Sequence, residues 1–322
     1  MTQVATLTAS DGKAGYQFGG SVAIDGDTIF VGNGNLAFGT GGGYVFVKPA
    51  RGWKTRHETA KLACLGLVAV AGDTAVCGGG DGALVYIKPQ TGWKSTSNYD
   101  ALLVTTDGSK NTFSSIVTNG QIVAIGAADI NNESDVAYLY VKPKNGWGTK
   151  SNKKHILGQT AKLTNSDSTS GDGFGISVAI SGDTVTVGAP YTADNNGTLG
   201  AAYVFVEPAT GWTNMTETAK LTANTTSYPS ILGWSVAVCG DTLVAGNPNG
   251  GNNDNHQGDA FVFVKPTTGW TTTETPNAQL TPSHSQEDDP FGWSVAISGQ
   301  TIVIGDINVT YTQPGAAYVF GD

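Results

Sequence analysis

Two acidic groups near the C-terminal end of the sequence contain the residues best suited to bind a metal ion. One group surrounds His256 and the other surrounds His284, and together they supply the candidate ligands Asp254, Asp259, Asp288 and Asp289. Carboxylate oxygens suit a hard divalent cation, and a neighbouring histidine would admit a transition metal. Their spacing matches no metal-binding signature, so we expect no cofactor and keep a divalent cation as the alternative to solvated polar loops.

Two tryptophans are candidates for ligand binding. Trp234 and Trp293 directly follow the glycines Gly233 and Gly292 at the start of a repeated strand. Aromatic rings near a polar surface can stack on a sugar or another planar ligand. Simple packing between neighbouring sheets is the alternative, because such strands are usually buried on both faces.

Support for catalysis is weaker than support for binding. A nucleophilic enzyme needs a nucleophile, a base and an orienting group that meet in space. The chain has four histidines, and it shows no nucleophile elbow or phosphate-binding loop. We leave enzymatic activity uncertain and favour its absence. The alternative is a hydrolase or lyase that acts on a polysaccharide with Asp259, Asp288 and Asp289 as acid and base.

A strand pattern that repeats six times along the chain must position these candidates. The copies begin at Ser21, Leu67, Ser115, Ser177, Ser235 and Ser294. In every copy a glycine stands five residues later, where a two-residue hairpin requires a positive φ. A period of about 40 to 60 residues indicates a propeller or a solenoid, so each copy should form one antiparallel sheet.

Each copy continues with two strands rich in β-branched and aromatic residues, and five copies continue further with a turn that starts at proline. A tryptophan ends each of these five turns, and we expect these residues to be structural: Trp53, Trp93, Trp147, Trp212 and Trp270. A fourth strand follows in five copies, and the sixth version of its pattern stands at residues 5–8. We therefore predict an all-β, six-bladed β-propeller with four antiparallel strands per blade, whose N-terminal strand closes the last blade.

The repeats assign residues 1–322 to a single domain. Their approximate limits are 9–63, 64–104, 105–164, 165–222, 223–281, and 282–322 together with 1–8. The net charge is −9, so the chain lacks the basic surface that nucleic-acid binding requires. We expect a monomer with no nucleic-acid partner and no membrane insertion, because no apolar run is long enough to span a bilayer.

Three cysteines are too few and too scattered for a disulfide framework. We therefore interpret Cys64, Cys77 and Cys239 as small buried apolar residues. The N-terminus shows no basic segment followed by an apolar one, so no signal peptide is expected in the sequence. A secreted or cell-surface location stays open, because a mature chain would look the same.

Phe174-Gly175 and the segment Gly188-Ala189-Pro190 resemble the FG-GAP repeats of bacterial surface proteins and of integrin α-subunit propellers. Weaker versions stand at Phe18-Gly19 and Phe291-Gly292. The resemblance implies a β-propeller and suggests adhesion or ligand binding, often outside the cell. Calcium-binding members use an Asp-rich loop between the first and second strands. That connection is a short glycine turn here, so those calcium ligands have no counterpart.

In an up-and-down blade, the loops between blades lie on the same face as those between the second and third strands. We call this the top face. Its loops vary in length, and variable loops on a rigid scaffold often carry sites. Repeat two shortens both of its top loops, so we expect a notch beside blade two. The residues expected to line it are Asn33, Asn35, Phe38, Asp129 and Asn131.

This mixture of amides, a carboxylate and an aromatic ring suits a hydroxyl-rich ligand. The leading hypothesis is therefore a non-enzymatic recognition or adhesion module that binds a glycan or a protein surface through its top-face loops. A lectin-like, extracellular role would follow. A purely structural repeat domain is the remaining alternative.

Overall fold

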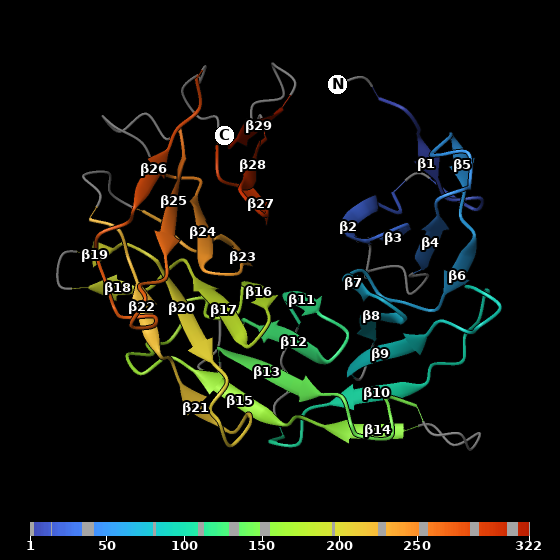
Figure 1. Cartoon of the computed structure of the whole chain (residues 1–322), viewed down its shortest axis with the longest axis horizontal. Coiled ribbons are helices and arrows are strands. Elements are labelled where there is room, and N and C mark those ends of the chain that lie inside the picture. The colour runs from blue at the N-terminus through green and yellow to red at the C-terminus, as the bar shows by residue number, and fades with distance from the viewer. Residues whose placement is uncertain are drawn as a thin grey trace. The chain divides into compact units, whose positions relative to one another are not determined.

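β-Strands are the regular elements of the computed structural model throughout the part of the chain that it describes. That part comprises residues 3–13, 15–33, 42–79, 82–108, 113–128, 135–148, 155–194, 197–224, 230–250, 257–283, 290–307 and 315–321. The strands form six larger sheets, each built around one copy of the repeat (Figure 1). The protein is thus an all-β, six-bladed β-propeller, as the repeats predict.

The first three blades take their strands in sequence order from the inner strand outward. Blade one contains β2 (Phe18–Asp25), β3 (Thr28–Asn33), β4 (Gly43–Val47) and β6 (Ala60–Leu62). Blade two contains β7 (Val68–Ala71), β8 (Thr74–Gly79), β9 (Gly82–Ile87), β10 (Ala101–Val104) and an added outer strand, β14 (His155–Gly158). Blade three contains β11 (Ser115–Thr118), β12 (Ile122–Ala127), β13 (Val136–Val141), β15 (Ala161–Thr164) and the added strand β21 (Met215–Thr216).

The last three blades follow the same order, and Figure 1 shows the strands of blade five, in orange, side by side. Blade four contains β16 (Ser177–Ser181), β17 (Thr184–Ala189), β20 (Ala201–Val206) and β22 (Ala219–Leu221). Blade five contains β23 (Ser235–Cys239), β24 (Thr242–Asn247), β25 (Asp259–Val264) and β26 (Ala278–Leu280). Blade six contains β27 (Ser294–Ser298), β28 (Thr301–Asp306) and β29 (Ala316–Phe320). A short hairpin of β18 (Ala193–Asp194) and β19 (Gly197–Thr198) stands apart.

The contacts divide the chain into two compact units. The first comprises residues 1–109, 116–123 and 140–159. The second comprises residues 110–115, 124–139 and 160–322. The assignment of residues 1–322 to a single domain stays a prediction.

The N-terminal segment forms β1 (Leu7–Thr8), which pairs in parallel with β5 (Arg56–His57). The fourth strand of blade three makes an equivalent contact: β15 pairs in parallel with β21, the short strand that precedes the fourth strand of blade four. β1 therefore has the local surroundings of a fourth strand. The sixth sheet has three strands in place of the expected four, and its completion by residues 5–8 stays a prediction.

Close contact between neighbouring blades explains the glycines of the repeat. A Cβ atom on Gly188, in β17, would lie 1.9 Å from the carbonyl oxygen of Gly233 and 2.4 Å from Oγ of Ser177. The hydroxyl of Ser177 donates a hydrogen bond to that carbonyl at 2.9 Å. Ser235 repeats this bond to the carbonyl oxygen of Gly292 at 2.8 Å. The second strand of one blade can thus approach the turn before the inner strand of the next blade only where no side chain intervenes.

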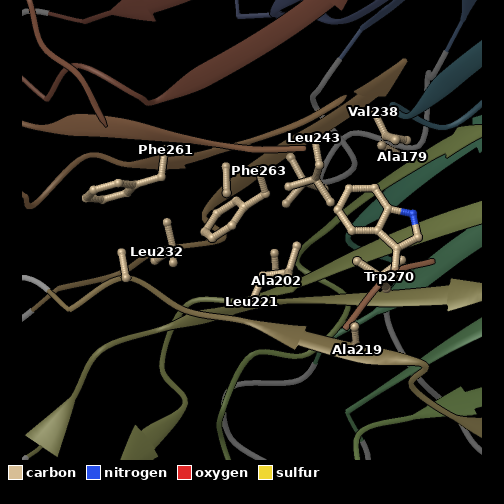
Figure 2. Close-up of a cluster of buried hydrophobic side chains, with 14 residues drawn as sticks. Ala179, Ala202, Ala219, Leu221, Leu232, Val238, Leu243, Phe261, Phe263 and Trp270 are labelled. Carbon is tan, nitrogen blue, oxygen red and sulfur yellow. The ribbon is translucent and has the colours of Figure 1, made fainter. Parts of the chain in front are cut away.

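Four of the five repeated turn tryptophans belong to the hydrophobic core. Trp270 belongs to the hydrophobic cluster between blades four and five. Figure 2 shows its indole ring among Leu243, Val238, Ala179 and Ala219. The other turn tryptophans of blades two to four are also buried, at Trp93, Trp147 and Trp212. Trp53 is only partly buried against its cluster. Burial of such a large ring contributes about 2 to 3 kcal/mol, so the predicted structural role is confirmed for the four buried tryptophans and stays a prediction for Trp53.

The interpretation of the cysteines is wrong for two of the three. Cys64 and Cys77 form a disulfide, while Cys239 is a free, partly buried thiol. Cys64 follows β6 of blade one, and Cys77 lies within β8 of blade two. The short connection between these blades places both side chains in the same hydrophobic cluster, a proximity that counting cysteines in the sequence cannot show.

Candidate ligand-binding site

The structure brings two of the predicted ligand-binding residues into contact. Trp234 and Trp293 precede β23 and β27, the inner strands of neighbouring blades. Each follows a left-handed glycine, with φ of 88° at Gly233 and 93° at Gly292. The N–H of Trp234 donates to the carbonyl of Ile231, and the N–H of Trp293 donates to Pro290, both at 3.2 Å. A tight turn thus presents each indole ring at the same level of its blade.

The two indole rings form a tilted pair. Their centroids lie 4.8 Å apart and their planes meet at 48°. Trp293 is 38% exposed, whereas Trp234 is partly buried. At this distance the rings touch, so no ligand fits between them. Trp293 therefore offers the accessible ring, and Trp234 supports it.

Behind the tryptophan pair, Asp259 anchors a buried hydrogen-bond network. Its side chain accepts hydrogen bonds from Nδ2 of Asn247 and Nε2 of Gln279, each at 2.8 Å. Oδ1 of Asn247 in turn accepts the N–H of Ile231 at 2.7 Å. Because the carbonyl of Ile231 accepts the N–H of Trp234, the network holds the turn that positions this indole.

Asp259 is 1% exposed, and burial raises its pKa to about 6, against the two amide hydrogen bonds that lower it. Both carboxylate oxygens already accept an amide hydrogen bond. The described contacts therefore give Asp259 a positioning role. Its role as a metal ligand stays a prediction, and the other candidate ligands, Asp254, Asp288 and Asp289, lie outside the described residues.

The described part of the chain holds no group of three or more His, Cys, Asp or Glu side chains arranged as metal ligands. Within the same residue ranges, no helix is long and apolar enough to cross a membrane.

Of the residues predicted around blade two, the structure describes Asn33. Its side chain is buried, and its Oδ1 accepts the N–H of Gly42 at 3.1 Å, which ties together the ends of the loop between β3 and β4. Asn35, Phe38, Asp129 and Asn131 lie outside the described residues. Ligand binding at the expected notch stays a prediction.

Sequence reasoning missed Asn247 and Gln279, the two amides that hold Asp259. A signal for Asn247 was present, because it follows the glycine of the second strand just as Asn33 and Asp306 do in their repeats. Each of these three residues is buried. A polar residue repeated at a buried strand end indicates a loop anchor.

Four-stranded antiparallel blades and glycine-mediated contacts between them define a repeat β-propeller. The FG-GAP repeat family matches the chain at residues 1–47, 157–205, 215–263 and 275–320. These segments cover more than half of the sequence, and the chain belongs to this family. Each match runs from a fourth-strand pattern to the third strand of the following sheet, which agrees with the repeat order found in the sequence.

Several solved structures are similar in fold. Hydrazine synthase of Kuenenia stuttgartiensis has a TM-score of 0.55 and 11% identity, and the match covers 94% of this chain and 80% of that one. Sqt1 of Chaetomium thermophilum has a TM-score of 0.54 and 14% identity, with 94% and 73% covered. Hsv2 of Kluyveromyces lactis has a TM-score of 0.51 and 7% identity, with 95% and 73% covered.

No curated protein matches the chain. The identities to the solved structures are so low that the likeness shows the fold alone, and the names of these proteins differ widely. A propeller with FG-GAP repeats is a repeat and binding domain in general terms. Its particular function must be argued from the site.

Proposed function

We propose that this propeller is a recognition module without catalytic activity that binds a glycan or a protein surface through its top-face loops. The observation that carries the proposal is the tryptophan pair. Trp293 keeps 38% of its surface exposed although Trp234 packs against it. Large aromatic rings held rigidly at a surface are typical anchors of binding sites.

An extracellular, adhesive role agrees with the disulfide between Cys64 and Cys77. Disulfides form and persist mainly in oxidising compartments such as the cell exterior or the periplasm. The proposal therefore places the chain in a secreted or cell-surface protein.

The buried state of Asp259 supports binding over catalysis. A general acid or base must reach its substrate, whereas both oxygens of this carboxylate face amides of the protein.

A glycan array tests the proposal with the purified chain, with and without EDTA. We expect binding to a subset of glycans that EDTA does not alter, and loss of this binding in Trp293→Ala. Val264→Ala is the matched control, because Val264 is 44% exposed at the opposite end of β25 from Asp259. Cleavage of a bound glycan would contradict the non-enzymatic proposal. An unchanged array pattern in Trp293→Ala would move the site elsewhere.

A further inference from the structure

The acidic residues in the part of the chain that carries Trp234 and Trp293 indicate which kind of glycan the site would bind. Resting on the proposed function, we propose that the ligand is an uncharged glycan, one sugar ring of which stacks on the exposed face of Trp293.

The segment that carries both tryptophans is strongly acidic. Residues 223–322 contain a single lysine, Lys265, and no arginine. Their carboxylates are those of Asp241, Asp254, Asp259, Glu274, Glu287, Asp288, Asp289, Asp306 and Asp322. Lys265 follows the end of β25 opposite Asp259, and its Nζ lies 2.9 Å from Oδ1 of Asp241. Apart from His256 and His284, which count as neutral in the formal charge at pH 7, this segment therefore offers no cation for a sulfate, a uronate or a sialic acid.

Two buried carboxylates near the tryptophan pair also argue against an anionic ligand. The Asp259 side chain supports the turn of Trp234, and its backbone carbonyl packs against Gly292, the residue before Trp293. Asp306, 7% exposed, follows the partner of Ser294 in the ladder between β27 and β28, so it lies at the level of Trp293. Above its pKa of about 6 the Asp259 carboxylate is ionised, and water screens a buried charge poorly, so this carboxylate disfavours an anionic ligand stacked on Trp293.

The ring geometry argues against a site for an alkylammonium ion or a lysine side chain. Aromatic cages hold such cations between separated rings, and the 4.8 Å centroid distance leaves no such space between Trp234 and Trp293.

Exposed large apolar side chains are few in the part of the sequence around Trp293. Within the described residues 290–307 they are Trp293 and Ile307. One indole face matches the apolar face of one sugar ring, and the surrounding polar groups can bond its hydroxyls. A protein partner would need to bury an area of about 1,200 Å² or more.

Isothermal titration with three sets of oligosaccharides tests this inference. The probes are neutral hexose and N-acetylhexosamine oligomers, their uronic-acid or sulfated counterparts, and deacetylated glucosamine oligomers. We expect a neutral oligomer to bind with an affinity independent of salt. Trp293→Ala should weaken it about tenfold, and Trp293→Phe should retain most of it, because a ring is kept. Val264→Ala should bind as the unmodified chain does.

The outcomes separate the inference from the proposed function. One contrary result is that the chain prefers the anionic or the cationic oligomers, with an affinity that falls as salt rises. That result overturns the inference that the ligand is uncharged and leaves the proposed glycan recognition intact. Binding of none of the three sets, by a chain with an unchanged melting curve, overturns the glycan ligand altogether. Equal loss of affinity in Val264→Ala and Trp293→Ala would show that Trp293 does not carry the binding.

Discussion

Nδ2 of Asn247 donates a hydrogen bond to Oδ1 of Asp259 at 2.8 Å, in a site where both side chains are buried. The other amide atom of Asn247 accepts the N–H of Ile231 at 2.7 Å. One asparagine thus joins a buried carboxylate to the turn of Trp234. The position of the Trp234–Trp293 pair thus depends on a buried polar network, because a ring can bind well only where its backbone is fixed.

Asn247→Ala should destabilise the fold and loosen the tryptophan pair. The change leaves the Ile231 N–H without its acceptor and removes one donor from Asp259, and each such buried loss costs about 1 to 3 kcal/mol. Chemical denaturation measures the loss of unfolding free energy. Asn277→Ala is the matched control, because Oδ1 of Asn277 accepts the Val264 N–H at 2.7 Å in an exposed setting. Equal losses of unfolding free energy in the two variants would show that the buried network stabilises the fold no more than an exposed hydrogen bond does.

Asp259 should make the fold less stable as pH rises from about 4 to about 6. Its pKa is near 3.8 in the unfolded chain and about 6 in the folded one, so the folded state keeps a proton that the unfolded state loses. Below pH 4 the group contributes nothing, and above pH 6 its cost is complete, at about 3 kcal/mol. Asp259→Asn should remove this dependence, since its oxygen can still accept from Asn247 while the Gln279 amide rotates.

Denaturation curves of both proteins between pH 4 and pH 7 measure the effect. The difference between the two curves isolates Asp259 from carboxylates such as Asp11 and Asp167, whose pKa values are lowered and whose contributions have the opposite sign. A constant difference in stability across this range would refute the assignment.

Gly188→Ala should destabilise the contact between blades four and five by about 3 kcal/mol or more, because its Cβ would collide with the Gly233 carbonyl at 1.9 Å. Gly182→Ala is the control. Gly182 has φ of +58° and nothing within 4 Å of a built Cβ, so it should cost only about 1 kcal/mol from backbone strain. Thermal melts of both variants rank the two effects, and a milder loss in Gly188→Ala would contradict the close-approach explanation.

Periodicity made the blades predictable, because a strand pattern with a glycine turn can form only a hairpin. It also placed Trp234 and Trp293 at equivalent positions of successive repeats, which neighbouring blades bring together. The sequence could not show that Asp259 is buried, since an acidic residue beside a polar loop has the same pattern whether solvated or anchored. The Cys64–Cys77 bond was likewise hidden, because it depends on how two blades meet.

Loss of the disulfide should lower the stability of blades one and two. The bond joins residues 13 apart, and closing a loop of this length contributes about 2 to 4 kcal/mol. We expect Cys64→Ser combined with Cys77→Ser to lower the melting temperature, and a reductant to do the same to the unmodified chain. Cys239→Ser is the control, since this thiol is free. Insensitivity of the unmodified chain to reductant would show that the bond is not formed.

Removal of residues 1–8 should destabilise blade one, because the N-terminal segment contacts it as a fourth strand contacts the next blade. Ser10, after β1, donates from its N–H and hydroxyl to Glu58 at 2.9 and 2.6 Å. Ser166, after β15, makes the same two bonds to Glu217 at 2.9 and 2.6 Å.

The truncation removes the β1–β5 pairing, and the hydrogen bonds from Ser10 to Glu58 lose the strand that positions Ser10. We expect a loss of several kcal/mol, at about 1 kcal/mol for each hydrogen bond and somewhat more for each buried apolar side chain. Removal of residues 1–3 alone is the control, since these precede the paired segment. Thermal melts compare the two truncations. If removal of 1–8 melts like removal of 1–3, β1 contributes nothing to the fold and its equivalence to a fourth strand is wrong.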